Sequence, residues 1–126
     1  MSHVGIVIIS HSEQVAEGVK AIIRQVVEEV PVETAGGTDD GEIGTSLDKI
    51  LNAIDRADAN KGVLLFYDLG SAKMNAEIAI EMCNKENVLL VEAPLLEGAY
   101  IGAVEAGLGK EIDEIVTSIK NSFRNN

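Results

Sequence analysis

Three apolar runs and one short β-branched run predict four β-strands. The stretch Val4–Glu13 begins with an apolar run that stops abruptly at Ser10-His11-Ser12. A run that is apolar at every position is typical of a strand that helices cover on both faces of a parallel sheet. The other three predicted strands are, in chain order, Val30–Thr34, Gly62–Tyr67 and Val88–Val91.

Polar residues mark where helices are expected to begin. Ser10 stands three residues before Glu13, which is the spacing of a capping box, and this predicts the start of the first helix. Thr45 or Ser46 is expected to cap the second helix. Between the second strand and that cap, residues 35–41 are rich in glycine and aspartate and predict a flexible or functional loop.

Apolar residues at helical intervals predict which faces of the helices are buried. The third helix is expected to begin at Ser71 or Asn75. Residues 95–107, rich in Gly and Ala, and Lys110–Phe123 predict two further helices. The expected inward positions are Val15, Val19, Ile22, Ile23 and Val26; Leu47, Ile50, Leu51 and Ile54; and Met74, Ile78, Met82 and Cys83.

The alternation of strands and helices predicts an α/β fold with a mostly parallel four-stranded sheet between two helical layers. We expect the strand order 2-1-3-4 and one domain that spans residues 1–126. In that order the first and third strands are neighbours. His11 and Asp68, which follow these two strands, could therefore touch at the carboxyl edge of the sheet, where ligands bind in such folds.

Composition and charge narrow the function classes. The 126 residues are 46% hydrophobic, which is enough for one core. The formal net charge of −11 argues against nucleic-acid binding and fits either a basic protein partner or a plain solvated surface. The lone Cys83 cannot form an internal disulfide, and the chain lacks an apolar run long enough for a signal or a membrane span, so we expect a cytoplasmic protein.

His11 is the candidate for covalent chemistry. A neutral imidazole is a nucleophile near pH 7, and a carboxylate on one ring nitrogen leaves the lone pair on the other. Asp68 is the candidate carboxylate, so the two residues suit a phosphoryl carrier. Helix starts and glycine-rich turns supply N–H and O–H donors for phosphate. The expected phosphate-binding residues are Ser12, Gly37, Thr38, Thr45, Ser46, Gly70 and Ser71.

Each of these residues also has a plainer interpretation. His11 could be a capping or core histidine, Asp68 could cap a helix, and the glycine-rich loop could be a simple connection. Asp39 and Asp40 disfavour a phosphate site unless they face solvent or a basic partner. His3 is expected at the surface. The spacing of histidines and cysteine does not fit a metal site, and no nucleophile elbow is present.

Four stretches resemble one protein family. They read IVIISHSEQVAEGV, GGTDDGEIGTS, DLGSAKMNAE and EAPLLEGA, and they occur in the family's order. They look like the phosphotransfer subunits M of bacterial dihydroxyacetone kinases that depend on the phosphoenolpyruvate:sugar phosphotransferase system, which have a mannose-type enzyme IIA domain. Sugar-transporter members of that fold typically carry Gly-His-Gly and a DLFGGSPFN-like run, from which Ser10-His11-Ser12 and DLGSAKMN depart.

The resemblance implies a reaction and its partners. His11 would take a phosphoryl group from the phosphocarrier HPr and pass it to ADP bound in subunit L, which serves subunit K. Asp68 matches the orienting residue of the family, and no cofactor is expected on this chain beyond the covalent phosphohistidine. The family often forms homodimers, and the small residues after Pro94 could serve that interface or internal packing. A non-enzymatic scaffold that binds partners through an acidic face is the alternative of another class.

Overall fold

Four parallel strands lie side by side in the order β2-β1-β3-β4. The computed structural model describes residues 2–124, in which the strands are β1 (Gly5–Ser10), β2 (Val32–Gly36), β3 (Val63–Tyr67) and β4 (Val88–Leu90). The predicted α/β class and strand order are therefore confirmed.

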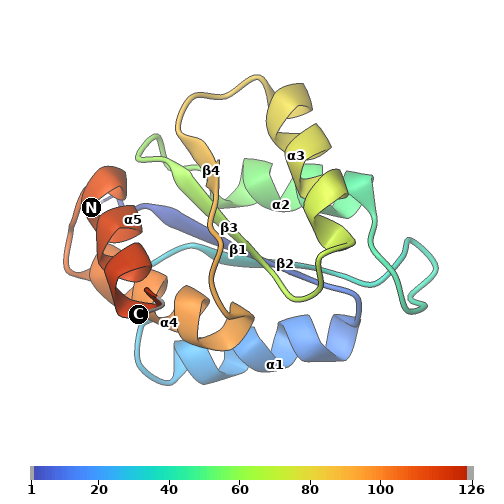
Figure 1. Cartoon of the computed structure of the whole chain (residues 1–126), viewed down its shortest axis with the longest axis horizontal. Helices are drawn as coiled ribbons and strands as arrows, with labels where there is room; N and C mark the ends of the chain where they lie inside the picture. The colour runs from blue at the N-terminus through green and yellow to red at the C-terminus, as the bar shows by residue number, and fades with distance from the viewer. Residues whose placement is uncertain (1, 125–126) are drawn as a thin grey trace.

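Helices cover both faces of the sheet (Figure 1). One layer holds α1 (Glu13–Arg24), α4 (Leu95–Gly107) and α5 (Ile112–Ser122), and the other holds α2 (Leu47–Ala57) and α3 (Ala72–Cys83). In β1, Ile6 and Ile8 pack into the first layer, whereas Val7 and Ile9 pack into the second. This explains why β1 is apolar at every position.

The second strand begins two residues later than the pattern predicts. Pairing with β1 starts where the Ile6 amide donates to the Pro31 carbonyl at 2.8 Å, and it continues to Gly36. Val30 is buried in the core but lies before the strand. At Val30 the sequence pattern therefore predicts burial correctly and strand pairing wrongly.

The first helix is capped by Ser12 and not by the predicted box of Ser10 and Glu13. The Ser12 Oγ accepts the Val15 amide at 3.3 Å. Ser10 is the buried last residue of β1, and its hydroxyl donates to Asp68 instead. The tertiary contact therefore overrides the local capping pattern.

One helix buries a different face from the one predicted, and a second helix buries only part of the predicted face. In α3 the predicted inward residues Met74, Ile78 and Met82 are exposed, and alanines face the sheet and α2. In α1 the predicted Val19 and Ile23 are buried, whereas Val15 and Ile22, and Val26 just after the helix, are exposed. Small side chains allow close packing, so in α3 residue size and not hydrophobicity alone selected the buried face. The residues buried are Ala72, Ala76 and Ala79 in α3, and Ala16, Val19 and Ile23 in α1.

The small residues of α4 serve internal packing. A Cβ atom at Gly98 would lie 2.9 Å from the Ala93 Cβ and 3.2 Å from the Phe66 ring, and one at Gly102 would lie 3.2 Å from the same ring. The predicted helix 95–107 is confirmed, and Gly98 and Gly102 are where it approaches Phe66 of β3. No helix among residues 2–124 combines the length and the apolar character that a membrane span needs.

Candidate functional site

The site lies where β1 and β3 end next to each other. Ile9 pairs with Tyr67, so the residues that follow them leave the sheet side by side. The His11 Nδ1 and the Asp68 Oδ1 lie 3.0 Å apart. The contact expected from the strand order is therefore present.

Four donors converge on the Asp68 carboxylate. The Oδ2 atom accepts the Ser10 hydroxyl at 2.7 Å and the His11 amide at 3.0 Å. The Oδ1 atom accepts the Leu69 amide at 2.7 Å besides contacting the His11 ring. Partial burial raises the pKa of Asp68, but these hydrogen bonds outweigh it and hold the pKa below its ordinary value of 3.8. The carboxylate is therefore ionised and can only accept.

An ionised Asp68 decides the tautomer of His11. Because a carboxylate offers no proton, the Nδ1 atom carries the hydrogen and the Nε2 atom keeps its lone pair. The Ser71 hydroxyl lies 2.8 Å from Nε2, at an exposed position, and donates to that lone pair. The ring therefore presents a nucleophilic nitrogen at the surface.

The loop between β2 and α2 is tied to the same edge of the sheet. The Gly44 amide donates to the His11 carbonyl at 2.9 Å, and the Gly37 amide donates to the Ser10 carbonyl at 3.0 Å. Gly37 has φ of 75°, and a Cβ atom there would lie 3.0 Å from the Glu42 carbonyl oxygen. A side chain at Gly37 would therefore strain the loop where it meets β1.

The predicted phosphate-binding residues divide into two groups. Ser71 contacts Nε2, Thr45 accepts the Asn75 amide at 2.8 Å, Ser12 caps α1, and Gly70 is exposed at the turn before α3. Their roles toward phosphate stay predictions.

The second group already uses its donors within the loop. Besides Gly37, the Thr38 amide donates to the Glu42 carbonyl, and the Ser46 hydroxyl donates to Asp39 while capping α2. Their contacts favour a role in shaping the loop, and their predicted contact with phosphate is untested.

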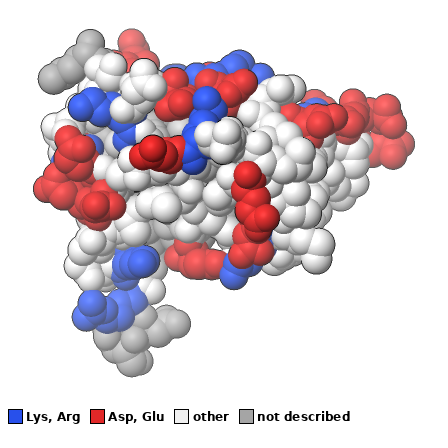
Figure 2. All heavy atoms as spheres, turned by 90° about the horizontal axis from the view of Figure 1, so that it is seen from above, with Lys and Arg blue, Asp and Glu red and all other residues white. Residues whose placement is uncertain are grey.

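Acidic side chains gather at the end of the molecule where this loop projects (Figure 2). Asp39, Asp40 and Glu42 are exposed there. Asp39 and Asp40 are both exposed to solvent. This is one of the two arrangements in which they would not disfavour a phosphate site. The loop that carries them also contacts the His11 carbonyl through the Gly44 amide.

One polar cluster was not found from the sequence. The Tyr67 hydroxyl donates to the Glu92 Oε1, and the Lys73 Nζ lies 2.8 Å from the Glu92 Oε2. The hydrogen bond from Tyr67 to Glu92 raises the pKa of Tyr67, and the hydrogen bond from Lys73 lowers the pKa of Glu92. The pairing of β3 with β4 and the packing of α3 beside them bring these residues together, so no local spacing signals the cluster.

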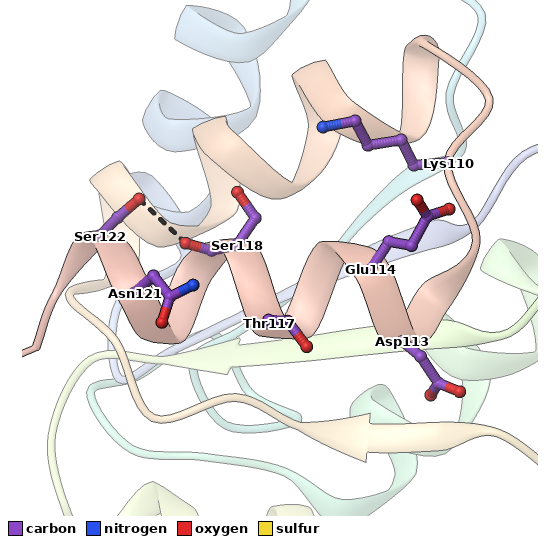
Figure 3. A pocket seen from close by; sticks show the side chains of 7 residues that line it. All are labelled: Lys110, Asp113, Glu114, Thr117, Ser118, Asn121 and Ser122. Atoms are coloured by element: carbon purple, nitrogen blue, oxygen red, sulfur yellow. Dashed lines mark hydrogen bonds between the residues drawn. The ribbon is translucent and has the colours of Figure 1, made fainter.

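A surface hollow lies away from the His11 cluster. It has a volume of about 700 Å³ and opens on α5 (Figure 3). It shares no residue with the site, and within it the Ser122 hydroxyl donates to the Ser118 carbonyl at 3.0 Å. Its lining consists of side chains from one exposed helix and the turn before it: Lys110, Asp113, Glu114, Thr117, Ser118, Asn121 and Ser122.

Fold and site together define a doubly wound α/β domain with a carboxylate-bound histidine at the switch point of its sheet. The model of the EIIA-man family, described as the PTS system fructose IIA component, matches residues 5–116, and the chain belongs to this family. The resemblance to mannose-type enzyme IIA domains is thereby confirmed.

Two curated relatives within this family are DhaM subunits of dihydroxyacetone kinases. A phosphoryl donor subunit DhaM of the PEP-dependent dihydroxyacetone kinase 1 of Listeria innocua is 47% identical over 92% of this chain and 92% of its own. The phosphotransferase subunit DhaM of the PTS-dependent dihydroxyacetone kinase of Lactococcus lactis is 46% identical over 82% of this chain and 84% of its own.

Solved structures agree on the fold. A crystal structure of a protein of unknown function is 36% identical, with a TM-score of 0.85 over 95% of this chain and 94% of that one. A sigma-54 interaction domain protein from Enterococcus faecalis, 13% identical, has a TM-score of 0.70 over 98% of both chains and shares the fold.

Proposed function

We propose that this protein is the phosphoryl donor subunit of a dihydroxyacetone kinase and carries the phosphoryl group on His11. The hydrogen bond of 3.0 Å between Nδ1 and the Asp68 carboxylate supports this most directly, because it places the reactive lone pair on Nε2, where the ring is exposed and its one hydroxyl contact among residues 2–124 is Ser71. The similarity to DhaM subunits of Listeria innocua and Lactococcus lactis supports the kinase over a sugar transporter.

The chemistry is a pair of in-line transfers. The Nε2 lone pair of His11 forms a bond to the phosphorus of the donor phosphohistidine while the donor's own P–N bond breaks. Asp68 keeps its hydrogen bond to Nδ1 and so stabilises the positive charge that develops on the ring. In the second transfer the P–N bond of His11 breaks and a terminal phosphate oxygen of ADP forms the new bond.

We propose HPr as the donor and ADP on subunit L, which serves subunit K, as the acceptor. The exposed Asp39, Asp40 and Glu42 would steer a basic partner toward His11. The chain would need no cofactor of its own, and it would act in the cytoplasm, where Cys83 stays reduced.

The test is stepwise phosphorylation. Incubation with phosphoenolpyruvate, enzyme I and HPr is expected to add about 80 Da, one phosphoryl group, in an acid-labile and base-stable bond. The phosphorylated protein should then pass the group to ADP on subunit L and not to a sugar-permease domain. The proposal is wrong if no adduct forms, and transfer to the permease domain would reassign the protein to sugar transport.

We further propose that two copies associate through the uncharged face of α1. This face consists of the outward and α4-facing residues of α1 and of the turn after it. The charged residues of α1 lie on the other flank at helical spacing, where Glu13 bonds to Lys49 and Glu17 to Thr34; the other two are Lys20 and Arg24. A groove of about 350 Å³ between Ile22 and α4 continues the face, and its α4 wall carries one acidic side chain, Glu97. Its members are Gln14, Val15, Gly18, Ala21, Ile22, Gln25 and Val26.

Charge favours a second copy as the occupant of this face. Copies that each carry a net charge of −11 repel one another, and a face whose α1 part is uncharged lets them meet with Glu97 as the one acidic side chain in its groove. A basic partner would instead be drawn to the acidic loop beside His11.

Sedimentation of three proteins tests the dimer. Wild type and Met82→Lys are expected to be dimers and Ile22→Lys a monomer, since both replaced side chains are exposed but only Ile22 lies on the face. A monomeric wild type or a dimeric Ile22→Lys variant would contradict it. Loss of phosphoryl uptake by a dimeric Ile22→Lys protein would assign the face to a phosphotransfer partner.

A further inference from the structure

Asn75 joins the two segments that flank the reactive nitrogen. It lies one helical turn after Ser71 on α3, so both side chains project from the same side of the helix. Its amide nitrogen donates to the Thr45 Oγ1 at 2.8 Å in a partly buried contact. Asn75 thus links the helix that carries Ser71 to the loop between β2 and α2.

Residues next to both ends of this link on α3 and in the loop contact His11. On one side the Ser71 hydroxyl lies 2.8 Å from the His11 Nε2. On the other side Gly44, the residue before Thr45, donates its amide to the His11 carbonyl at 2.9 Å. Three hydrogen bonds and the intervening backbone thus connect His11, Ser71, Asn75, Thr45 and Gly44 in a ring. The Thr45 hydroxyl is therefore fixed to a segment that is anchored to His11 on both sides.

The direction of the Asn75 hydrogen bond leaves one proton available. A threonine hydroxyl has a single hydrogen and two lone pairs. One lone pair of the Thr45 Oγ1 accepts the Asn75 amide, and among residues 2–124 the hydroxyl donates to no acceptor. Its hydrogen can therefore be given to an anion at the site.

We propose that Asn75 is a positioning residue that turns the Thr45 hydroxyl hydrogen toward the phosphoryl group on His11. The inference rests on the proposed function, because it presupposes a phosphoryl group on Nε2. The Ser71 hydroxyl and the Thr45 hydroxyl then bind phosphoryl oxygens from two sides. These donors stabilise the charge on the transferring group.

Asn75→Asp tests the direction of the bond with almost no change in shape. The new carboxylate can only accept, so the Thr45 hydroxyl must donate to it and its hydrogen is withdrawn from the phosphoryl group. We expect the rate of phosphoryl uptake at saturating phospho-HPr to fall about tenfold or more, the usual value of a hydrogen bond to a charged group. The apparent affinity for phospho-HPr should stay unchanged.

A double-mutant cycle shows whether Asn75 acts through Thr45. Thr45→Val should cause a similar loss, and adding Asn75→Asp to Thr45→Val should cost no more. Glu77→Gln, an exposed change on the same helix that also alters one charge, should behave as wild type. Thermal unfolding of each variant, followed by circular dichroism, verifies that it is folded.

The outcomes separate this inference from the proposed function. If wild type takes up no phosphoryl group, the proposed function fails. If wild type is phosphorylated and folded Asn75→Asp keeps its rate, Asn75 does not orient Thr45 and the inference is overturned. An equal further loss from Asn75→Asp in the Thr45→Val background would also overturn it, because the effect would then come from the added charge.

Discussion

The two histidines of the chain lie at opposite ends of the same strand and differ in every feature that matters for reactivity. His3, before β1, is 7% exposed, and its Nδ1 lies 2.8 Å from the Ala106 carbonyl of α4. His11, after β1, has a side chain 19% exposed and contacts the Asp68 carboxylate and Ser71. A neutral carbonyl only anchors a ring, whereas a carboxylate also stabilises the charge that the ring gains in a reaction.

The largest expected effect is loss of the reactive nitrogen. His11→Ala is expected to abolish phosphorylation by phosphoenolpyruvate, enzyme I and HPr, as measured by intact mass. His3→Ala should keep full labelling, while it lowers the free energy of unfolding by about 1–3 kcal/mol through the loss of a buried hydrogen bond. Labelling that persists in His11→Ala and disappears in His3→Ala would reverse the assignment.

Asp68→Asn replaces the charged carboxylate that accepts from the His11 ring with a neutral amide. The His11 ring then has a neutral partner, as the His3 ring has in the Ala106 carbonyl. The amide no longer compels Nδ1 to carry the hydrogen, so we expect transfer to slow by about 10- to 100-fold, the cost of losing comparable orienting partners in metal sites. Rapid-quench measurement of phosphoryl uptake provides the rate. An unchanged rate in a folded variant would reduce Asp68 to a structural residue.

The Ser71 hydroxyl is the only hydroxyl that contacts the His11 Nε2 among the described residues, and Ser71→Ala removes it. Ser71→Ala is expected to slow uptake by about threefold to tenfold, which corresponds to ~0.5–1.5 kcal/mol for one hydrogen bond. Ser122→Ala, on exposed α5, is the matched control and should leave the same rate unchanged. Equal rates for both variants would show that Ser71 does not assist the transfer.

The smallest effect concerns stability in acid. Because the pKa of Asp68 is lower in the folded protein than its ordinary value of 3.8, its contribution is complete above that value and is lost as pH falls through the folded pKa. The free energy of unfolding of wild type, measured with denaturant, should therefore fall more over this pH range than that of Asp68→Asn. Parallel pH profiles would show that the contacts of Asp68 do not stabilise the fold.

Local pattern located the site better than it located the packing faces. The apolar run of β1 and the expected strand order were enough to bring His11 to Asp68, because parallel neighbouring strands end at one edge. The pattern predicts Met74 of α3 and Ile22 of α1 as core residues, and both are exposed. Val19 and Ile23 of α1 are buried as predicted. Hydrophobic periodicity does not register how little space a neighbouring helix leaves.

His3 and Ser10 show the same limit at the level of single residues. His3 is expected at the surface from the sequence and is buried, because the residue that covers it, Ala106, is 103 positions away along the chain. Ser10 had the spacing of a helix cap and instead binds Asp68. In both cases a long-range contact replaced the local preference that the sequence suggested.

By itself, the sequence determined the α/β class, the strand order and the candidate nucleophile, because hydrophobic run length and the residues at strand ends are local properties. Tertiary structure alone decided the tautomer of His11, the link from Asn75 to Thr45 and the uncharged face of α1. Each depends on atoms from separate segments meeting within hydrogen-bond distance or leaving a surface uncovered. Such distances are products of packing and have no signature in residue spacing.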